Sequence, residues 1–201
     1  MTEKSREHVR SFELLSRQTS RLLIVDMQQK LLPLIPVADR TIGNCRRLIE
    51  GAGIMQVPVF ATEQYPKGLG ETVPELRKYF TDIPSKVCFS CSESLNWGSA
   101  AAPENDRHQV VVAGIESHVC VLQTALDLIS QGYRVFIPAD AVASRGKLDW
   151  KIALERLSVA GATLTTTESV LFEWCEAAGT PEFKQISKLI VEGSSNSGDR
   201  G

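Results

Sequence analysis

Three reactive side chains follow or interrupt the apolar runs of this chain, which makes them candidates for joint chemistry. Asp26 directly follows the run at 21–25, Lys86 lies within the short apolar segment 85–89, and Cys120 comes shortly after the run at 109–113. If these runs are parallel strands, their carboxyl ends share one edge of the sheet, where ligands bind in such folds. A carboxylate, an ammonium and a thiol at one edge could act as general base, electrostatic support and nucleophile.

Each of the three also has an ordinary structural interpretation. Asp26 suits a helix N-cap or a turn, and Lys86 suits an edge strand from which its ammonium reaches solvent. Cys120 suits the small buried hydrophobe that most free cysteines are. Because Cys120 falls where a strand passes into a helix, we expect backbone N–H groups there to lower the pKa of its thiol.

The remaining cysteines and histidines offer weaker alternatives. His118 lies two positions before Cys120, and residues two apart on a helix face different ways, so we expect a capping or pocket-lining histidine. Cys88 and Cys91 form a lone CxxC, which leaves thiol-redox chemistry open. No second CxxC and no HxxxH completes a metal site, and no phosphate-binding glycine motif or GxSxG occurs. We therefore expect no metal and no cofactor, and no serine nucleophile.

Strand and helix patterns alternate along most of the chain. The alternation predicts a three-layer α/β/α fold with a mostly parallel, Rossmann-like, six-stranded sheet. The predicted strands are 21–25, 57–61, 85–89, 109–113, 133–138 and 162–166. The predicted helices are 37–54, 118–130, 147–160, 168–177 and 181–190, with a loop at 62–75 and a mixed segment at 92–106.

Length and composition predict one globular domain. The chain has 201 residues, of which 43% are hydrophobic and 23% charged. We expect a polar extension at 1–19, in which Leu14 and Leu15 dock as a short helix, a domain at 20–191 and a disordered tail at 192–201.

Charge and cysteine usage limit the partners. A net charge of −2 and a sequence pI near 6.0 argue against nucleic-acid binding, and no apolar run approaches the length of a membrane-spanning helix. The first 18 residues lack the apolar core of a secretory signal. The chain has five cysteines, an odd number that cannot all pair in disulfides within it. We expect a reduced, cytoplasmic protein that acts on a small molecule.

Four segments, in this order, resemble those of the isochorismatase-like cysteine hydrolases, and of their isochorismatase domain-containing branch above all: LLIVDMQQKLLP, VFATEQYPKGLGETVPEL, SKVCFS and VVVAGIESHVCVLQTALDL. With PADAVASR and PEFKQISKLI they span about residues 20–190. The resemblance implies that Asp26, Lys86 and Cys120 form the family's catalytic triad. It also implies a cis peptide at Ile115–Glu116, an oxyanion hole made by the Glu116 and Cys120 N–H groups, and a homo-oligomer. The apolar segment 168–190 is the expected interface.

Two departures from family patterns narrow the expected reaction. Residues 62–66 read TEQYP, where nicotinamidases of this family carry a metal-binding Asp-x-His-x-x-x-His. Members that cleave isochorismate commonly lack the nucleophilic cysteine, which is present here as Cys120. We therefore expect hydrolysis of a small carboxamide through a thioester; the alternatives are a redox protein using Cys88 and Cys91, or a non-catalytic binding module. The expected substrate pocket comprises Gln64, Tyr65, Phe89, Trp97 and His118.

Overall fold

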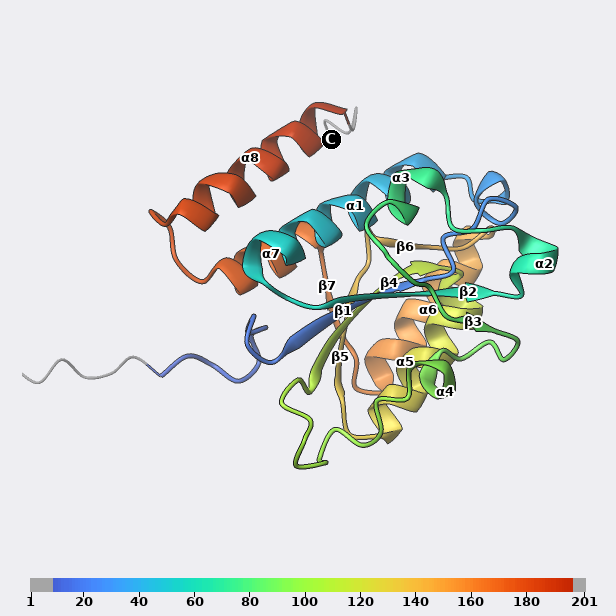
Figure 1. The fold of residues 1–201 in the computed structure, drawn as a ribbon, viewed down its shortest axis with the longest axis horizontal. Helices are drawn as coiled ribbons and strands as arrows, with labels where there is room; N and C mark the ends of the chain where they lie inside the picture. The colour runs from blue at the N-terminus through green and yellow to red at the C-terminus, as the bar shows by residue number, and fades with distance from the viewer. Residues whose placement is uncertain (1–8, 197–201) are drawn as a thin grey trace, which may run out of the picture.

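A parallel sheet forms the centre of the computed structural model, which describes residues 9–196 (Figure 1). The strands run in the order β3-β2-β1-β4-β5-β7, and a short β6 pairs with β4 beyond the end of β5; all pairings are parallel. The expected α/β fold with a mostly parallel sheet is therefore confirmed. The strands are β1 (Ser20–Val25), β2 (Val59–Gln64), β3 (Ser85–Lys86), β4 (Gln109–Ile115), β5 (Arg134–Pro138), β6 (Val142–Ala143) and β7 (Thr163–Thr165).

Helices cover both faces of the sheet. One face carries α1 (Ala38–Met55), α7 (Thr167–Cys175) and α8 (Pro181–Asn196), which pack against one another (Figure 1). The other face carries α5 (Leu122–Ser130) and α6 (Lys147–Val159). Short helices occupy the connections: η1 (Leu32–Leu34), α2 (Pro66–Leu69), α3 (Pro74–Arg77) and α4 (Ser92–Leu95).

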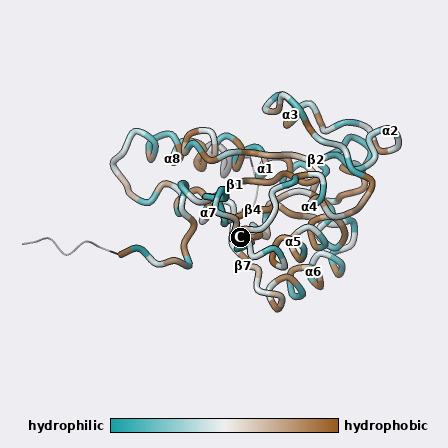
Figure 2. Tube along the Cα trace, turned by 60° about the horizontal axis from the view of Figure 1, so that its bottom comes forward, coloured by the Kyte–Doolittle hydropathy of each residue, from teal (hydrophilic) through white to brown (hydrophobic). Residues whose placement is uncertain are grey.

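The two central strands are buried on both faces, which explains their continuous apolar sequences. In β1, Leu22 and Ile24 pack on the α1 side, whereas Leu23 and Val25 pack on the α5 side. β4 alternates in the same way, and both strands are buried along their whole length. Figure 2 shows these hydrophobic strands between helices that carry hydrophilic stretches. Burial on both sides holds the ends of β1 and β4 rigidly.

The order of the strands reverses between β1 and β4. From β1 the chain builds outward through β2 and β3 on one side, and then returns to β4 to build through β5 and β7 on the other. Such a switch point leaves a crevice beyond the carboxyl ends of the two strands. Asp26 leaves β1 there with φ 50°, and Glu116 leaves β4. The fold therefore places both segments at one crevice.

Gly114 allows β4 to approach β1 closely at this edge. Its φ is +114°, and a Cβ added there would overlap the Val25 carbonyl oxygen and lie 2.7 Å from the Val25 nitrogen. Both atoms belong to the backbone, so no side-chain rotation can relieve the overlap. We expect Gly114→Ala to lower the free energy of unfolding by about 3 kcal/mol or more, as measured by urea denaturation. Gly53→Ala is the control, because Gly53 lies in α1 with nothing within 4 Å of an added Cβ. This variant should raise the free energy of unfolding by roughly 0.5–1 kcal/mol. Equal stability of the two variants would contradict this role.

Several elements differ from their predicted bounds on the β2 side. β2 runs from Val59 to Gln64 rather than over 57–61, because its pairing with β1 continues to the carboxyl edge. The predicted loop at 62–75 therefore contains the end of β2 as well as α2. β3 has two residues rather than the predicted five, because the chain turns after Lys86 and brings the Phe89 carbonyl to the Lys86 ammonium.

The predicted helix at 118–130 is divided in the structure. A π-helical turn, Ser117–Val121, precedes α5. β6 was not predicted at all, because two residues are too short for a periodic pattern.

Both ends of the described chain also differ from expectation. Leu15 is buried, but it docks without a helix: its N–H donates to the Glu173 carboxylate, and Leu14 stays partly exposed. At the other end α8 continues to Asn196, so the predicted disordered tail is wrong for 192–196. Ile186 and Ile190 anchor that helix in the α1 core. Residues 1–8 and 197–201 of the expected extension and tail lie outside the described residues. Among the helices of residues 9–196, none is long and apolar enough to cross a bilayer.

Candidate active site

A buried ion pair joins the ends of β1 and β3. Lys86 Nζ lies 2.7 Å from Asp26 Oδ2, and the two side chains are 3% and 0% exposed. The strands that carry them are separated by β2, so the pair spans three strands at the carboxyl edge. Breaking a buried pair leaves an uncompensated charge, which costs far more than an exposed pair is worth. Two of the three predicted residues are thus held in direct contact.

The Lys86 ammonium has an acceptor for each of its three protons. Besides Asp26, it donates to Gln64 Oε1 at 2.7 Å and to the Phe89 carbonyl at 3.0 Å. The Gln64 side chain is itself oriented, because its Nε2 donates to the Val87 carbonyl. Burial alone would lower the pKa of Lys86, but the charge of Asp26 and the hydrogen bond to its carboxylate act in the opposite direction, and the pKa is raised. Lys86 is therefore a fixed cation.

The Asp26 carboxylate has a partner on each side. Lys86 holds Oδ2, and the Thr62 hydroxyl donates to Oδ1 at 2.9 Å. The Cys120 thiol lies close enough to this carboxylate for each group to affect the pKa of the other. Burial raises the pKa of Asp26 above its ordinary value, although Lys86, Cys120 and Thr62 all act to lower it. A carboxylate with a raised pKa is a better proton acceptor than a carboxylate in water.

Cys120 is a thiol in this site, not a preformed thiolate. It lies in the π-helical turn after β4 and is 6% exposed. Burial and the Asp26 charge raise the pKa of Cys120, and the opposing effect of Lys86 is smaller. The expectation of a lowered thiol pKa is therefore wrong, because burial of the thiol, and after it the charge of the Asp26 carboxylate, raise the pKa. A thiol with a raised pKa needs a base before it can act as a nucleophile.

The Glu116 segment is fixed at the end of β4. The Ile115–Glu116 peptide bond is cis, at the position that the family resemblance implied. The Glu116 carboxylate accepts hydrogen bonds from the Arg145 N–H at 3.0 Å and from Arg145 Nε at 3.1 Å. This side chain is thus committed to Arg145, and the backbone of Glu116 is the part that can serve the crevice.

The predicted pocket residues differ in their relation to this centre. Gln64 contacts Lys86 directly, whereas Phe89 does so through its carbonyl and keeps a half-exposed ring. Tyr65 is half-exposed and lines an open groove of about 490 Å³ beside Lys86, together with Pro66, Lys67, Ser85, Val87, Cys88, Ser90, Glu93 and Ser94. His118 Nδ1 lies 2.9 Å from the Ser144 hydroxyl, so this ring nitrogen is engaged by Ser144.

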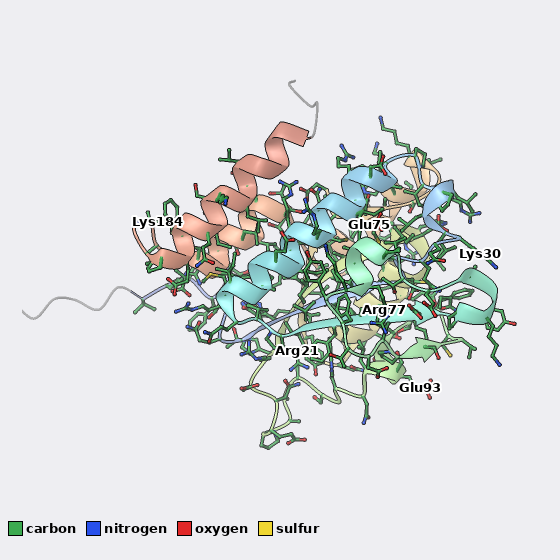
Figure 3. All side chains as sticks on the ribbon, turned by 45° about the horizontal axis from the view of Figure 1, so that its top comes forward. Arg21, Lys30, Glu75, Arg77, Glu93 and Lys184 are labelled. Carbon is green, nitrogen blue, oxygen red and sulfur yellow. The ribbon has the colours of Figure 1, made fainter. Side chains whose placement is uncertain are left out.

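Trp97 does not belong to the crevice. Its ring packs against Phe60 at 4.9 Å between centroids, and the Arg21 guanidinium lies 4.5 Å from its centre. Arg21 is at the amino-terminal end of β1, and Figure 3 shows it well apart from Lys30, which follows Asp26 in the chain. The prediction failed because the segment at 92–106 contains no long element from which the direction of Trp97 could be read.

Three supporting residues were not predicted. Thr62 donates to Asp26, and the Cys91 sulfur lies 3.2 Å from the Thr62 hydroxyl. Gln28 accepts from the Gln64 N–H and donates to the Gln64 carbonyl, which fixes the end of β2. The signal for Thr62 and Gln64 was their spacing of two, which places both on one side of a strand that ends at the crevice.

Within the described part of the chain, no three His, Cys, Asp or Glu side chains gather as a metal ion would need.

Comparisons with known proteins agree on a family. A family model described as "Isochorismatase domain" matches residues 20–169. A curated relative from Danio rerio, named isochorismatase domain-containing protein 2, is 42% identical over 185 residues, which cover 92% of this chain and 93% of the relative.

Solved structures share the fold over nearly the whole chain. One, described as the MAR1 ribonuclease from Caenorhabditis elegans, has a TM-score of 0.79 and 36% identity, and the match covers 89% of this chain and 92% of that one. Another, the YcaC gene product from Escherichia coli, is described as an octameric hydrolase of unknown specificity. It has a TM-score of 0.78 and 26% identity, with 93% of this chain and 96% of that one covered.

Proposed function

The chain belongs to the isochorismatase family, and on that premise we propose that it is a cysteine hydrolase that cleaves the C–N bond of a small carboxamide. The observation that carries this proposal is the buried Asp26–Lys86 ion pair, with the buried Cys120 thiol close enough to the carboxylate for the Asp26 charge to raise its pKa. A nucleophile, a base in contact with it and a group that holds the base are what acyl transfer requires. The raised pKa of Asp26 suits it to accept a thiol proton.

The proposed reaction has two halves. Asp26 removes the Cys120 proton as sulfur attacks the amide carbon, so that a C–S bond forms and the carbonyl electrons move to oxygen. The intermediate collapses, the C–N bond breaks, and the proton passes from Asp26 to the departing nitrogen. Water then attacks the thioester and gives a proton to Asp26; the carboxylic acid departs, and the proton returns to the Cys120 sulfur. Lys86 stays charged throughout and keeps Asp26 in position.

Negative charge on the tetrahedral oxygen needs donors that are already oriented. We assign this role to the backbone N–H groups of Glu116 and Cys120, which follow β4 at the crevice. One such donor typically contributes ~3–4 kcal/mol to a transition state of this kind. The binding of the Glu116 carboxylate by Arg145 supports the assignment, since it restrains the segment that carries the first donor.

Thiol-redox chemistry fits the geometry less well. Cys88 is exposed and Cys91 is buried, and the structure contains them as free thiols. Burial and the Asp26 charge raise the pKa of Cys91 to about 11. A redox pair needs an accessible thiol with a lowered pKa, so the hydrolase is favoured. Five free cysteines also suit a reducing compartment such as the cytoplasm.

The description of the nematode relative as a ribonuclease raises a second substrate class. A formal charge of −2 and a pI near 6.0 do not favour a polyanionic substrate, whose binding depends on clustered Lys and Arg. The octameric state described for the E. coli relative supports a homo-oligomer here as well. We propose that self-association uses the exposed apolar side chains of α7 and α8, such as Phe172 and Val191.

A substrate screen tests the proposed reaction. We expect wild-type protein to release ammonia or an amine from at least one member of a small-carboxamide library. Acid quenching should trap an acyl adduct on the Cys120 peptide, detected by mass spectrometry. Cys175→Ser changes a buried thiol of α7, outside the site, and should keep both signals. Release of amine with an adduct on another cysteine, or cleavage of RNA with no amide turnover, would contradict the proposal.

A further inference from the structure

A second thiol lies next to the base, and the proposed reaction does not use it. Cys91 is fully buried, just before α4. Its sulfur lies 3.2 Å from the Thr62 hydroxyl, which is 2.9 Å from Asp26 Oδ1. The Cys91 backbone N–H donates to the Thr124 hydroxyl of α5 at 2.9 Å, so the residue is held from both sides.

The number of protons fixes the direction of this hydrogen-bonded series. The Thr62 hydroxyl has one proton, and the ionised Asp26 carboxylate can only accept. Thr62 therefore donates to Asp26, and its oxygen is left as the acceptor toward Cys91. The hydrogen bond between Thr62 and Cys91 then requires that the Cys91 sulfur carry a proton. The raised pKa of Cys91 agrees with this, because the thiol keeps its proton at neutral pH.

We propose that Cys91 is a positioning residue: its S–H donates to the Thr62 hydroxyl and so holds that hydroxyl as the donor to Asp26. The inference rests on the proposed function, in which Asp26 is the base. Hydrogen bonds in such a series polarise one another, and a bond to a carboxylate favours its charged form. Cys91 thus lowers the pH at which Asp26 becomes able to accept the Cys120 proton.

Three other groups affect the pKa of Asp26. Lys86 from β3 pairs with the carboxylate and Thr62 from β2 donates to it, while the Cys120 thiol, in the turn after β4, lies close enough to affect its pKa. Cys91 is a further titratable group, and the Asp26 charge raises its pKa. The variants that test the positioning role change Cys91 and Thr62, so the ion pair and the nucleophile stay in place in them; Asp26→Asn and Cys45→Ala serve as reference variants.

The test follows the reactivity of Cys120 and needs no substrate. The rate of Cys120 alkylation by iodoacetamide is measured from pH 4.5 to 9 by peptide mass spectrometry, together with the unfolding free energy of each variant. We expect wild-type reactivity to fall at acid pH as Asp26 becomes protonated, and Asp26→Asn to remove this acid limb. Cys91→Ala should move the limb upward by about half a pH unit, and Cys91→Ser, which keeps a donor, should restore most of it.

Three comparisons separate positioning from packing. Cys45→Ala removes an equally buried thiol from α1, outside the site, and should change stability without moving the limb. Thr62→Val should move the limb by about one pH unit, and adding Cys91→Ala to it should move it no further. An unmoved limb in Cys91→Ala, an equal shift in Cys45→Ala, or additive shifts with Thr62→Val overturn the positioning role alone. A wild-type profile without an Asp26-dependent limb overturns the proposed function as well.

Discussion

Cys120→Ala is expected to reduce carboxamide turnover by at least about 10⁴-fold, because removing a nucleophile forces the reaction onto uncatalysed attack by water. The substitution removes one sulfur atom from a nearly buried position and leaves the Asp26–Lys86 pair intact. We therefore expect the protein to remain folded and to bind substrate with little change in affinity. The measurements are kcat and KM on the substrate found by the library screen, together with the urea unfolding curve.

Two variants make this result specific to the nucleophile. Cys120→Ser keeps a hydroxyl at the same place, but a serine hydroxyl is far harder to deprotonate than a thiol, so turnover should also be severely reduced. Cys175→Ala truncates a buried cysteine of α7, remote from the crevice, and should keep wild-type kcat. Turnover by Cys120→Ala within tenfold of wild type would rule out the thioester route.

The pairing of Asp26 with Lys86 was predictable, because each residue type is unusual within or at the end of an apolar strand. Parallel topology then places such ends at one edge without any knowledge of side-chain packing. The direction of the Cys120 pKa was not predictable in this way. It depends on how closely the thiol approaches Asp26 and on how little water reaches both groups, and neither is encoded in spacing along the chain.

The hydrogen bonds that support Asp26 could not be predicted without the register of the strands. Thr62 reaches Asp26 because β2 extends three residues beyond its predicted end and stays paired with β1. Cys91 reaches Thr62 because the chain turns sharply after the two residues of β3. A loop of this kind has no periodicity, so sequence patterns predicted neither Cys91 beside the base nor Trp97 beneath Arg21.

Lys86→Met is expected to lower the free energy of unfolding by about 3–5 kcal/mol at pH 8, because it leaves the Asp26 carboxylate buried without its cation. Burial already raises the pKa of Asp26, and Lys86 is the largest of the influences that oppose this. Without Lys86 the folded-state pKa rises further, while the unfolded-state value stays near ~3.9. Between these two pKa values the folded state binds more protons than the unfolded state, so stability falls as pH rises. The deficit of Lys86→Met should therefore be small near pH 4 and grow toward pH 8, in urea unfolding measured across this range.

The same charge argument predicts a rescue and a loss of activity. Asp26→Asn added to Lys86→Met removes the uncompensated carboxylate, so the double variant should be more stable than Lys86→Met at pH 8 and nearly independent of pH. Lys86→Met alone should lose at least ~10²-fold in turnover at neutral pH, because a protonated Asp26 cannot accept the Cys120 proton, and should regain part of it at higher pH. A deficit that does not change with pH, or a double variant no more stable than Lys86→Met, would show that Lys86 acts by packing rather than by charge. The titration of Asp26 governs both the acid limb of Cys120 reactivity and the pH at which the stability deficit of Lys86→Met develops. The two should therefore shift along the pH scale together.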